Sequence, residues 1–143
     1  MANKRDDMVK LSVIKDALED VDMDSTCYFN KETNEILWQW GFNEEYSTYK
    51  EEDEANDNII CMFDYFSKND YDIMQDFIDT IEDINLREKL YDATRGRGSF
   101  SRFRYIVESS DLLEEWYKYK DEKYKVIAKE WCIDNNIEFE EDC

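Results

Sequence analysis

The sequence predicts an α+β fold: a small antiparallel sheet packed with a C-terminal bundle of about four helices, plus one N-terminal helix. Strand-forming aromatic residues gather between positions 26 and 63, whereas apolar residues recur every three or four positions after residue 70. No Gly- or Ser-rich linker interrupts the chain. We therefore expect residues 1–143 to form a single domain.

The N-terminal helix is expected over residues 7–20, with Asp6 or Asp7 as its cap. Its apolar residues share one face: Met8, Leu11, Ile14, Leu18 and Val21. Residues 26–40 predict a hairpin, in which Asn34 takes the left-handed position of the turn and Gly41 ends the second strand. The apolar run 58–63 predicts a third strand that is buried on both faces.

Residues 43–58 are acidic and turn-like, and the run Glu51 to Glu54 predicts a solvated loop. A helix follows over 70–83, capped by Asn69 or Asp70. A second helix is expected from Asn85 to Arg95, with Glu88 as its capping partner and Gly96 at its end.

A third helix is expected to start at Ser99 and to bury Phe100, Phe103, Ile106 and Val107. The long fourth helix begins near Asp111 or Glu114 and ends at Asn135–Asn136. The apolar face that we expect for it contains Leu113, Tyr117, Tyr124, Ile127, Ala128 and Trp131.

The composition excludes several function classes. The chain has 18 basic and 37 acidic residues, a net charge of −19, and no histidine. A broad basic nucleic-acid interface and binding to anionic membranes are therefore not expected, and histidine-dependent triads and zinc sites are excluded. We expect no cofactor, no metal and no catalytic residue.

Four cysteines lie at positions 27, 61, 132 and 143, without the spacing of a zinc or redox site. We expect Cys27, Cys61 and Cys132 to be buried free thiols. The start of the chain lacks the apolar run of a secretory signal, so we expect a cytoplasmic protein that is a monomer or a dimer.

Two patterns are candidates for binding. Asp72, Asp76, Asp79 and Asp83 are spaced four, three and four apart, which predicts an acidic stripe along one helix. Charges about 4.5–6 Å apart along a helix are near the phosphate repeat of nucleic acid. The stripe is either a surface for a basic partner or the ordinary solvated face of an amphipathic helix.

The second pattern is the segment 95–104, RGRGSFSRFR, which holds four arginines and no acid. Its two glycines precede a helix start, where backbone N–H groups can receive an anion. We expect an anion or a partner near six residues: Arg95, Arg97, Gly98, Ser99, Arg102 and Arg104. Among them, Arg97 and Arg102 are expected to point outward. The structural alternative is that the glycines form turns and the arginines pair with nearby acids.

Taken with Glu115-Trp116-Tyr117, Tyr124 and Ala128-Lys129-Glu130-Trp131, this segment resembles the bacterial uncharacterised family UPF0158. Phe77-Ile78, residues 86–90 and the hairpin residues 28–35 also fit, and the resemblance covers roughly residues 9–139. The chain departs from the family pattern at Asn34, where glycine is usual, in the acidic loop 43–58, and in the absence of proline from the third strand. The resemblance supports the fold and implies no activity.

Two functions follow as hypotheses. The first is a non-enzymatic interaction protein that binds and regulates or inhibits a basic protein, one form of which would imitate nucleic acid. The second is an anion- or nucleotide-binding protein that uses the segment 95–104.

Overall fold

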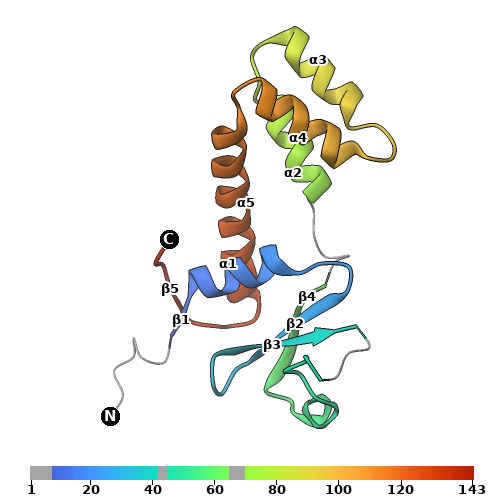
Figure 1. Ribbon diagram of the computed structural model, residues 1–143. Helices are drawn as coiled ribbons and strands as arrows, with labels where there is room; N and C mark the ends of the chain where they lie inside the picture. Colours follow the sequence, from blue (N-terminus) through green and yellow to red (C-terminus); the bar gives the residue numbers. More distant parts are fainter. Residues whose placement is uncertain (1–7, 42–44, 65–69) are drawn as a thin grey trace. The chain divides into compact units, whose positions relative to one another are not determined.

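The computed structural model describes residues 8–41, 45–64 and 70–143 and shows an α+β fold (Figure 1). The chain divides into two compact units. We call Met1–Lys68 with Tyr124–Cys143 the sheet unit, and Asn69–Lys123 the helical unit. Helix α5, Leu113–Asp134, begins in the helical unit and ends in the sheet unit. The expectation of a single domain over 1–143 stays a prediction.

The sheet unit is built on a three-stranded antiparallel sheet in the order β3-β2-β4. Strands β2, Ser25–Asn30, and β3, Glu35–Trp40, form the predicted hairpin, and Asn34 has the expected left-handed φ of 60°. On the core face, the ring of Phe29 lies edge-on to Trp131 of α5, with ring centroids 5.6 Å apart. Alternation along β2 thus buries Ser25, Cys27 and Phe29 beneath the helices.

Strand β4, Ile59–Asp64, is an edge strand, and the exposure of its residue Cys61 shows that the prediction of burial on both faces was wrong. Met62 and Phe63 are buried, but Cys61 is exposed. The register shifts because Cys27 pairs with Phe63 while Tyr28 pairs with Cys61, which leaves Met62 as an extra residue. Cys27 and Cys132 are buried as expected, and all four cysteines are free thiols.

The predicted N-terminal helix begins later than expected. Residues Val9–Lys10 form β1, which pairs in parallel with β5, Phe139–Glu140, and helix α1 then runs Leu11–Asp20. The expected apolar face is confirmed by four buried residues, namely Leu11, Ile14, Leu18 and Val21. The proposed caps Asp6, Asp7 and Asn69 lie outside the described residues.

The helical unit contains α2, Asp70–Asp79, α3, Ile84–Ala93, and α4, Ser99–Ser109, with the first turns of α5. Its centre is aromatic: the Phe103 ring lies 4.9 Å from Trp116 and 6.2 Å from Phe77. Trp116 is buried on α5 where Tyr117 was expected, and Tyr117 is exposed.

Hydrogen bonds to free backbone groups mark the start of α3 and the ends of α4 and α5. Helix α2 ends at Asp79 rather than at residue 83, and Asp83 is the N-cap of α3 in place of Asn85. At the end of α4, Asp111 has a φ of 59° and the Leu112 N–H donates to Val107 O over 2.9 Å. Helix α5 ends at Asp134, where Asn136 has a φ of 56° and the Ile137 N–H donates to Cys132 O over 2.8 Å.

Candidate functional site

The arginine segment connects α3 to α4 through two left-handed glycines. Gly96 has a φ of 73° and Gly98 a φ of 75°, and Gly98 rather than the expected Ser99 is the N-cap of α4. A Cβ at Gly98 would lie only 3.1 Å from Nη1 of Arg102, whereas a Cβ at Gly96 would meet nothing within 4 Å. The left-handed backbone at Gly98 therefore favours glycine, and a larger residue there would also push the Arg102 guanidinium by a few tenths of an ångström.

Arg102 is exposed, as the sequence predicts, but its guanidinium turns back onto the backbone, which the sequence does not predict. Its Nε donates to Ala93 O over 2.9 Å, and its two terminal nitrogens donate to Arg97 O and Arg95 O, each over 2.5 Å. The guanidinium thus binds three carbonyls of the segment that leaves α3. Because an α-helix leaves its last carbonyls without helical partners, this contact is structural: it ties the start of α4 to the end of α3.

The other three arginines of the segment are exposed as well. Arg95 lies 3.8 Å from Asp92, and both side chains are more than 70% exposed, so this pair contributes little. Arg97 and Arg104 are exposed, and so is Phe100, which is 47% exposed and not in the core as expected. Phe103, by contrast, is 1% exposed. The segment therefore combines one buried ring with a surface of cations and one exposed ring.

The acidic stripe is shorter than predicted. Asp72, Asp76 and Asp79 are exposed on α2, but Asp79 accepts a hydrogen bond from the hydroxyl of Tyr91. Asp83 lies beyond the helix, and its Oδ1 accepts from the N–H groups of Asn85 and Leu86 over 3.0 and 3.2 Å. Two of the four carboxylates thus have local partners, so the regular repeat that could imitate phosphates does not extend along one helix.

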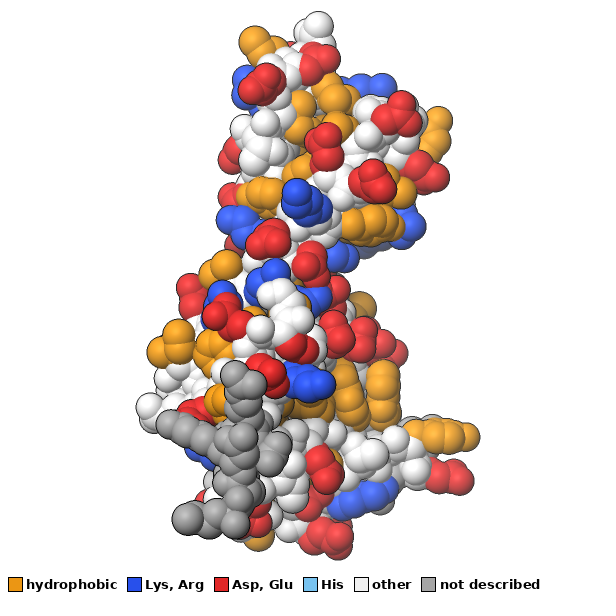
Figure 2. Space-filling view, turned by 90° about the vertical axis from the view of Figure 1, so that its left-hand side faces the viewer, with side chains coloured by type: hydrophobic (Ala, Val, Ile, Leu, Met, Phe, Trp, Pro, Cys, Tyr) orange, Lys and Arg blue, Asp and Glu red, His pale blue; other side chains and the backbone are white. Residues whose placement is uncertain are grey.

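Most of the net negative charge belongs to the sheet unit and not to the helical unit, which carries the stripe. The sheet unit has 9 basic and 23 acidic residues, a net charge of −14, whereas the helical unit has 9 and 14, a net charge of −5. On the face shown in Figure 2, acidic side chains are scattered among hydrophobic ones and do not form one continuous stripe. A basic partner would therefore be attracted most strongly to the sheet unit.

The acidic run at 51–54 is not the solvated loop that was expected. Residues Glu51–Ala55 form a 3₁₀ helix, η1, in which Asp53 Oδ2 accepts from the Lys50 N–H over 2.8 Å. Glu51, Glu52 and Glu54 are exposed, as predicted. The carboxylate of Asp53 is thus used to start the turn, and its three neighbours face the solvent.

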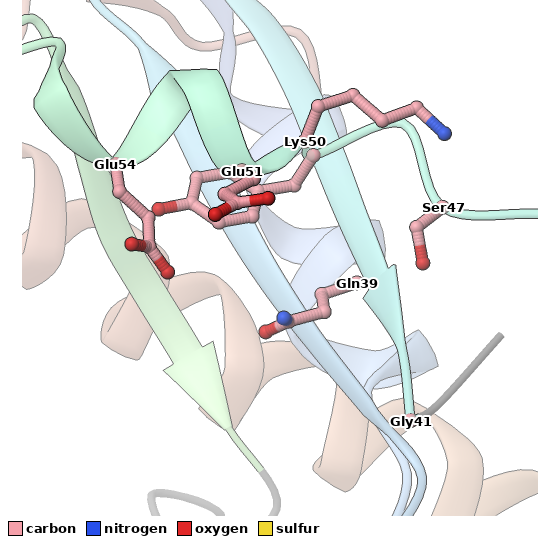
Figure 3. Close-up of a pocket in the computed structure, with 7 residues that line it drawn as sticks. Gln39, Gly41, Ser47, Lys50, Glu51 and Glu54 are labelled. Atoms are coloured by element: carbon pink, nitrogen blue, oxygen red, sulfur yellow. The ribbon is translucent and has the colours of Figure 1, made fainter. Parts of the chain in front are cut away.

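A hollow of about 390 Å³ lies beside this turn, lined by residues of β3, the 47–50 segment and η1: Gln39, Gly41, Ser47, Tyr49, Lys50, Glu51 and Glu54. In Figure 3 the side chains of Gln39, Glu51 and Glu54 extend toward a common space, whereas the ammonium of Lys50 points away from it. Hydrogen-bond acceptors therefore predominate around the hollow.

The walls of the hollow are held by hydrogen bonds to the outer edge of β3. Trp38 O accepts from the N–H groups of Thr48 and Tyr49 over 2.8 and 3.0 Å, and the Trp40 N–H donates to Ser47 Oγ over 2.9 Å. The Tyr49 ring stacks on Tyr28 with centroids 3.7 Å apart. The hollow is thus formed by residues whose positions the sheet fixes.

The electrostatics of the hollow are those of an anionic site. Burial, together with the charges of Glu54 and Asp53, raises the pKa of the Tyr49 hydroxyl above its usual value. The neighbouring carboxylates thus oppose any further negative charge, and the phenol stays a neutral donor and acceptor. A cation is the complementary ligand.

The sequence did not indicate this hollow. Gln39, Ser47 and Tyr49 carry no motif, and only the acidic run at 51–54 marked the region. In the described parts of the chain, no group of three or more His, Cys, Asp or Glu side chains has the arrangement of a metal site. Within the same residues, no helix is long and apolar enough to cross a membrane.

Comparison with known proteins gives one family and one curated relative. The family model described as "Uncharacterised protein family (UPF0158)" matches residues 11–142. The UPF0158 protein PA5073 of Pseudomonas aeruginosa is 33% identical over 67 residues, which cover 46% of this chain and 44% of that protein. The match thus spans less than half the length of this relative. No solved structure matches the chain.

Proposed function

This chain belongs to the uncharacterised protein family UPF0158, and we propose that it is a small, non-enzymatic, acidic module that binds and regulates or inhibits a basic protein. The observation that carries the proposal is the hollow lined by Gln39, Glu51 and Glu54, on a unit of net charge −14. The proposal places the protein in the cytoplasm, where free thiols persist.

An arginine or lysine side chain of the partner suits this hollow. A guanidinium has five N–H donors and no acceptor, and the hollow offers two carboxylates, an amide oxygen and hydroxyls. The stacked rings of Tyr28 and Tyr49 add an aromatic surface, over which a cation is attracted by the ring quadrupole. The hollow would therefore orient a cationic side chain and not only attract it.

Binding fits these carboxylates better than catalysis does. A carboxyl group that acts as a general acid is placed in desolvated surroundings, which tune its protonation. Glu51 and Glu54 are exposed. The surrounding charge of the sheet unit would instead raise the rate at which a basic partner arrives.

The test is a comparison of association kinetics. Proteins captured on the wild type from a lysate of the source cells, and released by high salt, supply the partner. Its association and dissociation rates are then measured against the wild type, against Glu51→Gln/Glu54→Gln, and against Glu130→Gln/Asp134→Asn. The last pair also removes two exposed charges from the sheet unit, but on α5 and away from the lining residues.

We expect the hollow variant to raise Kd by about tenfold or more, because two charged hydrogen-bond acceptors are lost. The α5 variant should slow association about twofold and leave dissociation unchanged. Partner activity measured with and without the chain then shows whether binding inhibits it. Salt-independent binding, or equal effects of the two variants, would contradict the proposal.

Two narrower ideas stay predictions. Imitation of nucleic acid by the stripe is less favoured, because Asp79 and Asp83 have local hydrogen-bond partners. The alternative function is an anion or nucleotide site in 95–104. It is less favoured because the guanidinium of Arg102 already donates to three backbone carbonyls. A thermal-shift titration with phosphate, comparing the wild type with Arg97→Ala, tests that alternative.

A further inference from the structure

Helix α4 has an outward face that the proposed function does not use. The inward side of the helix is formed by Phe103, Ile106 and Val107, which are buried. Two aromatic residues of the same eleven-residue helix are exposed: Phe100 at 47% and Tyr105 at 72%. Aromatic residues and arginine are enriched at the centres of protein interfaces, so exposed rings next to exposed arginines mark a candidate binding surface.

The charge around these rings is opposite to that of the chain. Between Asp92 and Glu108 the sequence has four arginines and no acid. All four are exposed, but the guanidinium of Arg102 is already bound to three backbone carbonyls, so Arg95, Arg97 and Arg104 are the candidates for binding a ligand. Phe100 and Arg104 are four positions apart on α4 and are therefore neighbours on its surface, and Arg97 belongs to the turn just before the N-cap Gly98.

The surface is also fixed in place. The hydrogen bonds of Arg102 to Ala93 O, Arg95 O and Arg97 O hold the turn that carries Arg97. The buried Phe103 ring, 4.9 Å from Trp116, holds the helix that carries Phe100 and Arg104. A binding surface that is ordered before the partner arrives has less entropy to lose on binding.

We propose that the exposed residues at the start of α4, Arg97, Phe100 and Arg104, dock a short acidic protein segment that contains an aromatic or aliphatic residue. Arginine forks match carboxylates in a bidentate geometry, and the exposed Phe100 ring takes the apolar residue. This surface is distinct from the hollow, so the proposal is independent of the proposed function.

Charge favours an acidic peptide over the other anionic partners. A nucleic acid is a long polyanion and would meet Asp92, Glu108 and the rest of a chain of net charge −19 on either side of this short face. An anionic membrane would be repelled in the same way. A short peptide can carry its charges only where the arginines are, and so avoids that repulsion.

The test is selection from a displayed library of random twelve-residue peptides. Peptides are selected for binding to the immobilised wild-type protein. Peptides that also bind the Arg97→Gln/Arg104→Gln variant are discarded, so that those kept depend on these arginines. We expect the remaining peptides to be enriched in Asp or Glu next to an aromatic or aliphatic residue. The selected peptide is then synthesised with a fluorescent label, and its Kd is measured by anisotropy.

The expected result is an increase in Kd of about tenfold for Arg97→Gln/Arg104→Gln and of about threefold or more for Phe100→Ala. The matched control, Lys89→Gln/Lys118→Gln, removes two exposed charges from the same unit and should change Kd less than twofold. Circular dichroism confirms that each variant is folded. Arg102 is not changed, because its loss would disturb the fold.

Several outcomes would overturn the proposal. These are no enrichment of acidic sequences, equal weakening by the control, and tighter binding of a twelve-nucleotide oligo(dT) than of the selected peptide. Self-association of the wild type in sedimentation, abolished by Arg97→Gln/Arg104→Gln, would identify a second copy as the occupant and would also overturn it.

Discussion

At the scale of single residues, Arg102 shows how an apparent binding residue can be part of the fold. Its guanidinium donates to Ala93 O at the end of α3 and to Arg95 O and Arg97 O in the turn that follows. We predict that Arg102→Ala lowers the free energy of unfolding by about 1.5–3 kcal/mol, the range for hydrogen bonds from charged groups. Urea denaturation measures it.

The matched control for Arg102 is Arg97→Ala, which removes the same charge from an exposed side chain of the same turn. Surface substitutions of this kind usually change stability by less than about 0.5 kcal/mol. If the two variants were equally stable, the three carbonyl contacts would not stabilise the turn.

The sequence could not distinguish Arg102 from its neighbours. Its acceptors are backbone carbonyls, which every residue has, so no pattern of residue types marks them. Helical phase predicts that Arg102 is off the buried face, and it is exposed, but phase gives no sign that its guanidinium turns back onto the backbone. Gly98 gave a better signal, because a glycine just before a helix start predicts a turn, and its φ of 75° is a conformation that favours glycine.

A second residue pair connects the two ends of the sheet unit. Asp142 Oδ1 accepts from the Ser12 N–H over 2.9 Å, and Oδ2 accepts from the Ser12 hydroxyl over 2.5 Å. These hydrogen bonds lower the pKa of Asp142. Because the folded pKa lies below the unfolded one, the contribution to stability is fully present above about pH 4 and is lost as the pH falls through the folded pKa.

We predict that Ser12→Ala destabilises the protein by less than about 1 kcal/mol at neutral pH, since the pair is exposed. The difference from the wild type should shrink as the pH falls below about 4. Chemical denaturation of both proteins over this range measures it, and Ser101→Ala, an exposed serine of α4, is the control. A difference that stays constant with pH would show that Asp142 is not involved.

At the scale of elements, the segments with a local signal were predictable. The hairpin of β2 and β3 follows from alternating strand formers and from Asn34, whose φ is 60°. The pairing of β1 with β5 was not predictable, because two strands of two residues each are joined by a contact between positions 9 and 139. No periodicity exists in so short a strand, and only the tertiary fold brings the partners together.

The two phenylalanines of α4 separate core from surface within one element. They are three positions apart and were both expected in the core, but Phe103 is 1% exposed and Phe100 is 47% exposed. Phe103→Ala should lower the free energy of unfolding by about 3–5 kcal/mol, because it leaves a cavity beside Trp116.

Phe100→Ala should lower the free energy of unfolding by less than about 1 kcal/mol, since part of the ring is already in water. Thermal and urea denaturation of Phe100→Ala, Phe103→Ala and the wild type measure the two losses in the free energy of unfolding. Equal losses would mean that Phe100 is packed in solution, and the docking surface on α4 would then lack its ring.

At the scale of the whole molecule, charge is distributed unevenly along the chain. The sheet unit carries −14 and the helical unit −5. Two like charges about 10 Å apart in water repel by about 0.4 kcal/mol before screening. Repulsion therefore opposes folding more strongly in the sheet unit. The net charge of the sequence indicates this cost, whereas no motif does.

We predict that added salt stabilises the sheet unit more than the helical unit, because screening removes more repulsion there. Hydrogen exchange of the Tyr28 and Phe29 amides in β2, compared with those of Phe103 and Ile106 in α4, measures the local opening free energies. From low salt to about 0.5 M NaCl, the gain in β2 should exceed the gain in α4. KCl should give the same difference, since screening does not depend on the cation. Equal gains at all four amides would mean that the two units open as one cooperative body, as the sequence prediction of a single domain requires.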